Sequence, residues 1–385
     1  MNKTENNKTH CSQDDFFLSP AEMQAIAAQY GTPLFLFDEA GIRRRAQHIL
    51  SLFPIPGSRQ YFPMHKCPHP ALLSILQEEG LGIQCRDKEE LATAREVGFT
   101  PDSILFSTMV WDENTAPELC RDHIPLLAGC PLALNGVVPG QVYLLTNLPR
   151  KRSSLGIGKV INTALGYSRE KLPAVIQSLR RRGVSKVGLW IRYEGNVTDI
   201  EFLSQWVSSA RTLAEGLAES GVQVDHIHME GGLGILYNRV KLQTLDTDKA
   251  AVSVAQAMEG AGQSISFALG EHLMEPCAVF AARVLAASCT DGMVVVDASQ
   301  HMLRFNTVDR YHHISVLGKE WVEGRSVYQV LGSVSANSNW LGRRRVLQSP
   351  MEDDILILHD VGCSVASFRD SKVLLRKASG EITKL

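Results

Sequence analysis

The strongest constraint on the fold is a regular alternation of short apolar runs and amphipathic stretches between residues 60 and 260. An alternation of strands and helices implies parallel strands joined by crossover helices, and about eight such units close into a (β/α)8 barrel. The predicted strands are Gln60–Met64, Gly82–Cys85, Ser103–Phe106, Val142–Leu145, Lys186–Ile191 and Val224–His228. The predicted helices are Ala40–Leu52, Pro70–Glu79, Lys88–Val97, Arg169–Arg181, Ile200–Ser220 and Asp246–Gly260.

The pattern changes after about residue 265, where short strands and turns follow one another with little helix. This texture predicts a second, antiparallel β domain. Two domains also agree with a length of 385 residues, which exceeds the usual size of one hydrophobic core. The predicted division is a disordered tail over 1–19, a segment over 20–39 that contributes to the β domain, a barrel over 40–265 and the β domain over 266–385.

The composition excludes several classes of partner. With a net charge of −2, the chain has no field that favours nucleic acid or an anionic membrane. It contains no run of eighteen apolar residues, and its first nineteen residues lack the apolar core of a signal peptide. Its eight cysteines are scattered without a CxxC pair, which predicts free thiols and a cytoplasmic location.

Five stretches, in this order along the chain, resemble one enzyme family. They are Tyr30–Asp38 (YGTPLFLFD), Tyr61–Leu72 (YFPMHKCPHPAL), Gly231–Ile235 (GGLGI), Phe267–Leu285 and Val295–Arg304 (VVDASQHMLR). Together they are similar to the fold-type III pyridoxal-phosphate-dependent decarboxylases, the ornithine/diaminopimelate decarboxylase family, and most of all to its siderophore-biosynthesis branch. The resemblance implies a TIM-like barrel with a C-terminal β-barrel domain, pyridoxal phosphate as cofactor, and an active site completed across a head-to-tail dimer.

The resemblance places His65 at the position of the lysine that forms the Schiff base, and Lys66 follows it. Successive side chains of a strand point to opposite faces. If His65 faces the barrel interior, Lys66 is therefore expected to face the outer helices. A one-residue slip or a bulge would instead bring Lys66 to the cofactor side, and this alternative stays open.

The cofactor's phosphate loop and its neighbours are altered as well. Glu230 stands where the family has its first glycine, Glu271 where it has an arginine, and Ala268 where an acidic residue pairs with the pyridinium nitrogen. A carboxylate about 4 Å from a phosphate charge costs on the order of 4 kcal/mol at an effective dielectric near 20. A micromolar site is worth roughly 8 kcal/mol, so cofactor affinity is expected to be lost unless both carboxylates turn to solvent or meet cations. The remaining loop positions are Gly231, Gly232 and Gly234.

Further positions implied by the resemblance lie elsewhere in the chain. Ser335 and Ala336 match the catalytic cysteine and its acidic neighbour, Ser364 matches a tyrosine, and Arg192 matches the imidazole that packs on the cofactor ring. Asn339 stands where aspartate is common. Most cofactor-facing groups of the family are thus replaced, while the packing motifs are retained.

The leading hypothesis is a decarboxylase homologue that has lost pyridoxal-phosphate chemistry and acts by binding. Its partner would be a second subunit, in a homodimer or a heterodimer with an active paralogue, or a small carboxylate or amino-acid-like metabolite. One alternative is an active amino-acid decarboxylase that uses Lys66. Another is different chemistry centred on His65, with Ser335 and the pair His312-His313.

A metal site is a further candidate, because His226, His228 and Glu230 form a workable ligand set. One strand supplies all three, and no distant ligand is identifiable. We therefore expect polar side chains of the barrel mouth at these positions and no metal.

Overall fold

The computed structural model describes residues 17–53, 58–110, 114–148, 165–197, 199–234, 245–304, 312–319, 325–334 and 339–385. The chain divides into two compact units, each of which is described by itself. The barrel unit comprises Ile42–Ile235 and Leu245–Glu275, and the β unit comprises Met1–Gly41, Leu236–Thr244 and Pro276–Leu385. All seven cysteines within the described ranges are free thiols.

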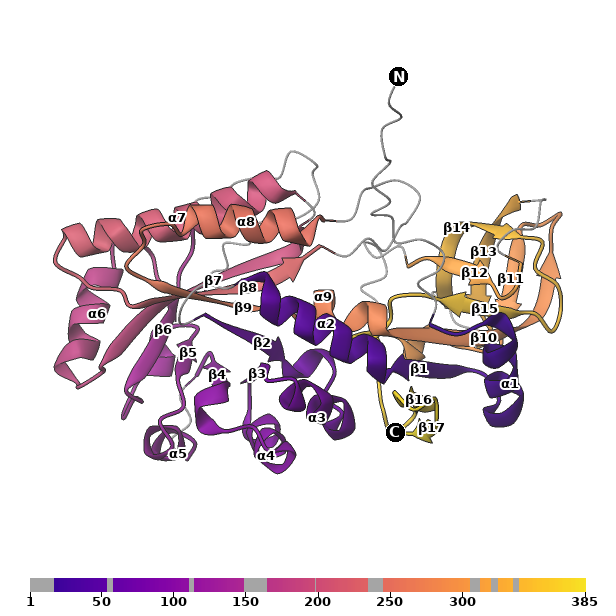
Figure 1. The fold of residues 1–385 in the computed structure, drawn as a ribbon, viewed down its shortest axis with the longest axis horizontal. Coiled ribbons are helices and arrows are strands. Elements are labelled where there is room, and N and C mark those ends of the chain that lie inside the picture. Colours follow the sequence, from indigo (N-terminus) through magenta and orange to yellow (C-terminus); the bar gives the residue numbers. More distant parts are fainter. Residues whose placement is uncertain are drawn as a thin grey trace, which may run out of the picture. The chain divides into compact units, whose positions relative to one another are not determined.

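The barrel unit is a closed barrel of the eight strands β2 to β9, and every neighbouring pair is parallel (Figure 1). The barrel predicted from the alternation is therefore confirmed. The strands are β2 (Arg59–Pro63), β3 (Gly82–Cys85), β4 (Ile104–Thr108), β5 (Leu126–Ala128), β6 (Gln141–Leu145), β7 (Lys186–Val197), β8 (His226–Leu233) and β9 (Ser264–Ala268). The helices are α2 (Glu39–Leu52), α3 (Pro70–Glu78), α4 (Lys88–Val97), α5 (Ala116–Arg121), α6 (Leu172–Arg181), α7 (Ile200–Glu219), α8 (Thr247–Ala257) and α9 (Gly270–Met274).

Three of these helices begin at an aspartate whose side chain accepts a backbone hydrogen bond in the first turn. These N-caps are Asp87 before α4, Asp199 before α7 and Asp246 before α8. Each cap satisfies an N–H group that has no partner inside the helix, which fixes where the helix starts.

The barrel interior is filled by aromatic and aliphatic side chains that come from strands around the whole barrel. The cluster consists of Tyr61, Leu105, Leu127, Tyr143, Leu145, Trp190 and Ala268. Glycines on neighbouring strands make room for the rings, since a Cβ at Gly82 would collide with Tyr61 and one at Gly188 with Tyr143. The interior is thus a packed core, on which the C-terminal ends of the strands form the mouth.

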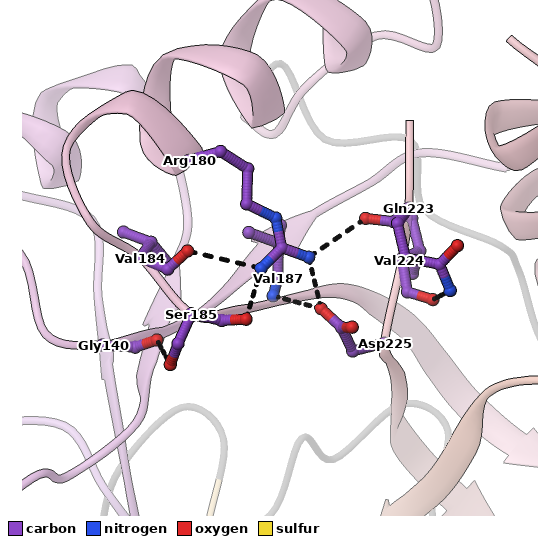
Figure 2. A network of polar contacts seen from close by, with 8 residues as sticks. All are labelled: Gly140, Arg180, Val184, Ser185, Val187, Gln223, Val224 and Asp225. Atoms are coloured by element: carbon purple, nitrogen blue, oxygen red, sulfur yellow. Dashed lines mark hydrogen bonds and ion pairs between the residues drawn. The ribbon is translucent and has the colours of Figure 1, made fainter. Parts of the chain in front are cut away.

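At the opposite, N-terminal end of the strands, Arg180 at the end of α6 joins the beginnings of β7 and β8 (Figure 2). Its Nη2 lies 2.6 Å from Asp225 Oδ2, and the same carboxylate oxygen accepts from Val187 N at 2.8 Å. The guanidinium also donates to three carbonyl oxygens, those of Val184, Ser185 and Gln223. This set of contacts, called the Arg180 clamp below, ties one helix to two strands.

The β unit is built around a nine-stranded sheet with the order β14-β13-β11-β10-β1-β16-β17, and β15 pairs with β10 and β12. The N-terminal strand β1 (Leu34–Asp38) lies between β10 and β16. The predicted β domain is confirmed, and its sheet is mixed, because most pairs are antiparallel whereas β1 with β16 and β11 with β13 are parallel. Neither pair is joined by a hairpin, so no tight turn forces its strands to run in opposite directions.

The other elements of this unit are the helix α1 (Pro20–Tyr30) and the remaining strands. These strands are β10 (Ala278–Ser288), β11 (Met293–Val296), β12 (Ile314–Val316), β13 (Arg325–Gly332), β14 (Trp340–Gln348), β15 (Ile355–Leu358), β16 (Val373–Arg376) and β17 (Ile382–Lys384). None of the helices in the described ranges is both long and apolar enough to cross a membrane.

Candidate functional site at the barrel mouth

The strand β2 ends at Pro63, and Met64–Lys66 form a single 3-10 turn. The expectation that His65 and Lys66 point to opposite faces of a strand is therefore wrong, because neither residue is in a strand. Proline lacks the N–H that would continue the ladder, so the chain turns directly after it. In a 3-10 turn successive side chains are about 120° apart, and both His65 and Lys66 are half-buried.

Lys66 forms an ion pair with Glu271, in which Nζ lies 2.8 Å from Oε1. The two residues are 205 positions apart in the chain, but β2 and β9 are neighbours in the barrel, and the 3-10 turn and α9 follow directly after them. Gly270 permits the close approach, since a Cβ there would lie 3.0 Å from Lys66 Cγ. Glu271 thus meets a cation, and the side chains of Lys66 and Glu271 keep 32% and 18% of their surface exposed.

Glu230 points into the barrel and is held by donors from two other strands. Its Oε2 accepts from Trp190 Nε1 at 2.8 Å and from Gln84 Nε2 at 3.1 Å. Arg192 Nε lies 3.5 Å from Oε1, and only 12% of the Glu230 side chain is exposed. The alternative in which Glu230 turns to solvent is wrong, because the polar groups of β3 and β7 converge on it.

Two histidines lie below Glu230 on the interior face of β8. His226 Nδ1 and Nε2 lie 2.6 and 2.7 Å from the hydroxyls of Ser264 and Ser266, and His228 Nδ1 lies 2.8 Å from Ser266 Oγ. Desolvation by burial lowers the pKa of His226 to about 4 and that of His228 to about 3, so both imidazoles are neutral at pH 7.

The candidate metal ligands therefore bond mainly to serine hydroxyls and to neutral donors. Among the residues that the structure describes, no group of three or more His, Cys, Asp or Glu side chains is arranged to hold a metal ion.

The glycines of the expected phosphate loop continue strand β8. Gly232 pairs with Asn196 of β7, Leu233 pairs with Val197, and Gly234 N donates to Val197 O at 2.6 Å. Gly231 has a φ of 149°, at the edge of the region that favours glycine. The N–H of Gly234 is thus already committed to β7.

The positions in the β unit that the resemblance singled out are only partly described. Ser335 and Ala336 lie outside the described residues. Ser364 is fully buried. The Asn339 side chain links two loops, since it accepts from Gln300 N at 2.8 Å and donates to Val334 O at 2.6 Å. An aspartate could not make the second bond, because an ionised carboxylate has no donor.

The histidine pair of the β unit takes part in internal packing. His312 Nδ1 lies 2.9 Å from His359 O, and the ring of His313 lies 5.0 Å from that of His359. His359 in turn bonds through Nε2 to the buried Ser315 hydroxyl at 2.9 Å. These contacts lie within the β unit.

Sequence reasoning missed two residues of the mouth, Gln84 and Trp190. Gln84 is the polar residue in the otherwise apolar strand GIQC, and this was a usable signal. Buried polar side chains are generally hydrogen-bonded, so its presence predicts a polar partner nearby. Trp190 carried no such signal, since its indole N–H becomes informative only once Glu230 is known to lie beside it.

Comparisons with known proteins agree with this architecture. Residues 39–125 match the family described as "Pyridoxal-dependent decarboxylase, pyridoxal binding domain". Protein TabA of Pseudomonas amygdali pv. tabaci is 27% identical over 358 residues, which cover 88% of this chain and 83% of that protein. Diaminopimelate decarboxylase of Methanothermobacter thermautotrophicus is 24% identical over 406 residues, covering 94% and 91%.

Solved structures share the fold over nearly the whole chain. Diaminopimelate decarboxylase from Helicobacter pylori complexed with L-lysine superposes with a TM-score of 0.79 at 16% identity, covering 94% of this chain and 95% of that one. Lysine/ornithine decarboxylase from Vibrio vulnificus complexed with putrescine gives 0.74 at 14% identity, covering 90% and 93%. With its parallel barrel and this order of motifs, the chain is similar over nearly its whole length to the pyridoxal-dependent decarboxylases, and it shares their fold.

Proposed function

We propose that this decarboxylase homologue does not hold pyridoxal phosphate in the manner of its family and acts by non-covalent binding. The observation that carries the proposal is the pair of carboxylates at the barrel mouth. The Glu230 carboxylate points into the barrel, where it accepts hydrogen bonds from Trp190 and Gln84, and Glu271 forms an ion pair with Lys66. Both carboxylates stand where the resemblance places groups that favour the phosphate.

The residues present do not fit the cofactor. Attack on an aldehyde requires the amine to be free to approach it, whereas Lys66 Nζ is held by Glu271 at 2.8 Å. A phosphate requires free backbone N–H groups or cations, but Gly234 N is bonded to Val197 O and the position of the family's arginine carries Glu271. Ser364 offers no reachable hydroxyl, because the side chain is fully buried in its unit.

The same proposal includes the ligand and the assembly. Solved relatives were crystallised with L-lysine or putrescine, and the mouth of this chain retains side chains of both charges, so we propose an amino-acid-like ligand. Assembly into a homodimer, or with an active paralogue, a cytoplasmic location and a role in siderophore biosynthesis stay predictions. The free thiols support a cytoplasmic location, because reducing compartments keep cysteines unpaired.

The test is to add pyridoxal phosphate to the purified protein, reduce with borohydride and search Lys66 for the cofactor's mass. No adduct is expected in the native chain. The matched variant is the double substitution Glu230→Gly with Glu271→Arg, which removes both carboxylates and restores the family residues. This variant is expected to take up cofactor, and a stoichiometric adduct on Lys66 of the unaltered protein would contradict the proposal.

One observation favours a second candidate, an active decarboxylase that uses Lys66. Glu230 is the register neighbour of Ala268, so the carboxylate missing from β9 has a counterpart one strand away. This candidate requires Glu271 to release the amine. It predicts carbon dioxide from L-lysine or diaminopimelate, with complete loss in Lys66→Ala and retention in His65→Ala.

A further inference from the structure

We propose that the barrel mouth recognises the ammonium group of a small amine through Glu230, Gln84 and His228. The inference rests on the proposed function, because it requires that the mouth is not filled by pyridoxal phosphate. It replaces the carboxylate metabolite considered from the sequence with a cationic ligand.

The first observation is the orientation of the Gln84 amide. The Glu230 carboxylate can only accept, so the amide turns Nε2 toward it, at 3.1 Å. The carbonyl oxygen of the same amide therefore points elsewhere. Gln84 is 2% exposed, and its Oε1 is buried without a hydrogen-bond partner. A buried acceptor of this kind signals a missing donor.

The second observation is the imidazole of His228. His228 is fully buried, and its Nε2 has no hydrogen-bond partner while Nδ1 lies 2.8 Å from Ser266 Oγ. When Nδ1 donates to Ser266, Nε2 presents a lone pair. Because His228 and Glu230 are two residues apart in one strand, both project from the same face of β8 into the barrel.

In the tautomer in which His228 Nδ1 donates to Ser266, Glu230, Gln84 Oε1 and His228 Nε2 supply three acceptors, which match the three N–H donors of an ammonium group. The charge of Glu230 makes these bonds charge-assisted and disfavours an anionic ligand in the same place. The rings of Tyr61 and Trp190 belong to the packed interior cluster that borders these acceptors. A metal ion is the weaker match, since no set of three or more ionisable ligands gathers in the described part of the chain.

Arg192 stands in for the ligand in this structure. Its Nε lies 3.5 Å from Glu230 Oε1, and its side chain remains 34% exposed. This contact is longer and less directional than the usual bidentate pairing of arginine with a carboxylate. An ammonium group that reaches normal hydrogen-bond distance displaces Arg192, so Arg192 acts as an internal competitor.

The experiment compares three probes of equal length, n-butylamine, 1-butanol and butyrate, by ligand-observed NMR or calorimetry on protein without added cofactor. We expect n-butylamine to bind at least tenfold more tightly than either of the others. Glu230→Gln is expected to weaken this binding at least tenfold, and the exposed Glu219→Gln to leave it unchanged. Arg192→Met is expected to tighten the binding of n-butylamine severalfold. Loss of an arginine with a purely structural role would not tighten binding.

Equal binding of n-butylamine and 1-butanol, or unchanged binding in Glu230→Gln, would overturn the inference. If Glu230→Gln fails to fold, the direction of change in Arg192→Met decides, because weaker binding there contradicts competition. An adduct of pyridoxal phosphate on Lys66 of the native chain would sink the proposed function itself. That result comes from a separate measurement, so the two failures are distinguishable.

Discussion

The two ends of the barrel use charged side chains in different ways. In the Arg180 clamp, the guanidinium donates to one carboxylate and three carbonyls, and Asp225 also accepts from a backbone N–H. At the mouth, Glu230 is bonded, but Gln84 Oε1 and His228 Nε2 remain without partners. A closed network stabilises one conformation, whereas a network with unused buried acceptors has capacity for a ligand. If the proposed function holds, the two ends of the barrel thus divide stability and ligand binding between them.

The largest effect is expected from acidification, which acts on the histidines below the mouth. Their pKa values, about 4 for His226 and about 3 for His228, lie below the value of roughly 6.5 in an unfolded chain. The unfolded chain therefore takes up protons as the pH falls below about 6.5, while the folded barrel does not. The free energy of unfolding should fall by on the order of 2 kcal/mol per histidine between pH 7 and pH 5, measured by urea denaturation.

His228→Gln should reduce this pH dependence, and the exposed His301→Gln should preserve it. An unfolding free energy that stays constant from pH 7 to pH 5 would contradict the neutral, buried state of the two imidazoles.

The next largest effect is expected in the Arg180 clamp. Arg180→Ala leaves the Asp225 carboxylate without its cation and three carbonyls without donors, which should lower the free energy of unfolding by about 2 kcal/mol. Denaturation curves of the variant measure the loss. The exposed neighbour Arg181→Ala is the control, with an expected change within about 0.5 kcal/mol. Equal losses in both variants would show that the clamp contributes nothing specific.

The smallest effect is expected from Gln84→Met at the mouth. The substitution removes a donor to Glu230, but it also removes an acceptor that is buried without a partner. These changes oppose each other, so the free energy of unfolding should fall by no more than about 1 kcal/mol. A loss as large as that of Arg180→Ala would remove the distinction between an open and a closed network.

The sequence predicted which residues form much of the candidate site, but it did not predict which of them contact one another. The order of motifs pointed to His65, Lys66, Glu230 and Glu271, and the barrel brings the last three to its mouth. The directions of the His65 and Lys66 side chains could not be anticipated, because Pro63 ends β2 one residue before the predicted end. The alternation of side chains between the two faces of a strand therefore does not extend to these residues. An alternation rule holds only while the strand continues, and that depends on the ladder formed with its neighbours.

The sequence by itself determined the class of fold, since strand and helix periodicity and the order of five motifs are local properties of the chain. Tertiary structure decided which charges meet. Lys66 and Glu271 are 205 residues apart and are joined only because closure of the barrel makes β2 and β9 neighbours. Closure likewise brings Gln84 and Trp190 onto Glu230, and the mixed direction of the β-unit strands follows from long-range pairing. Such contacts depend on the packing of distant segments, which local periodicity does not encode.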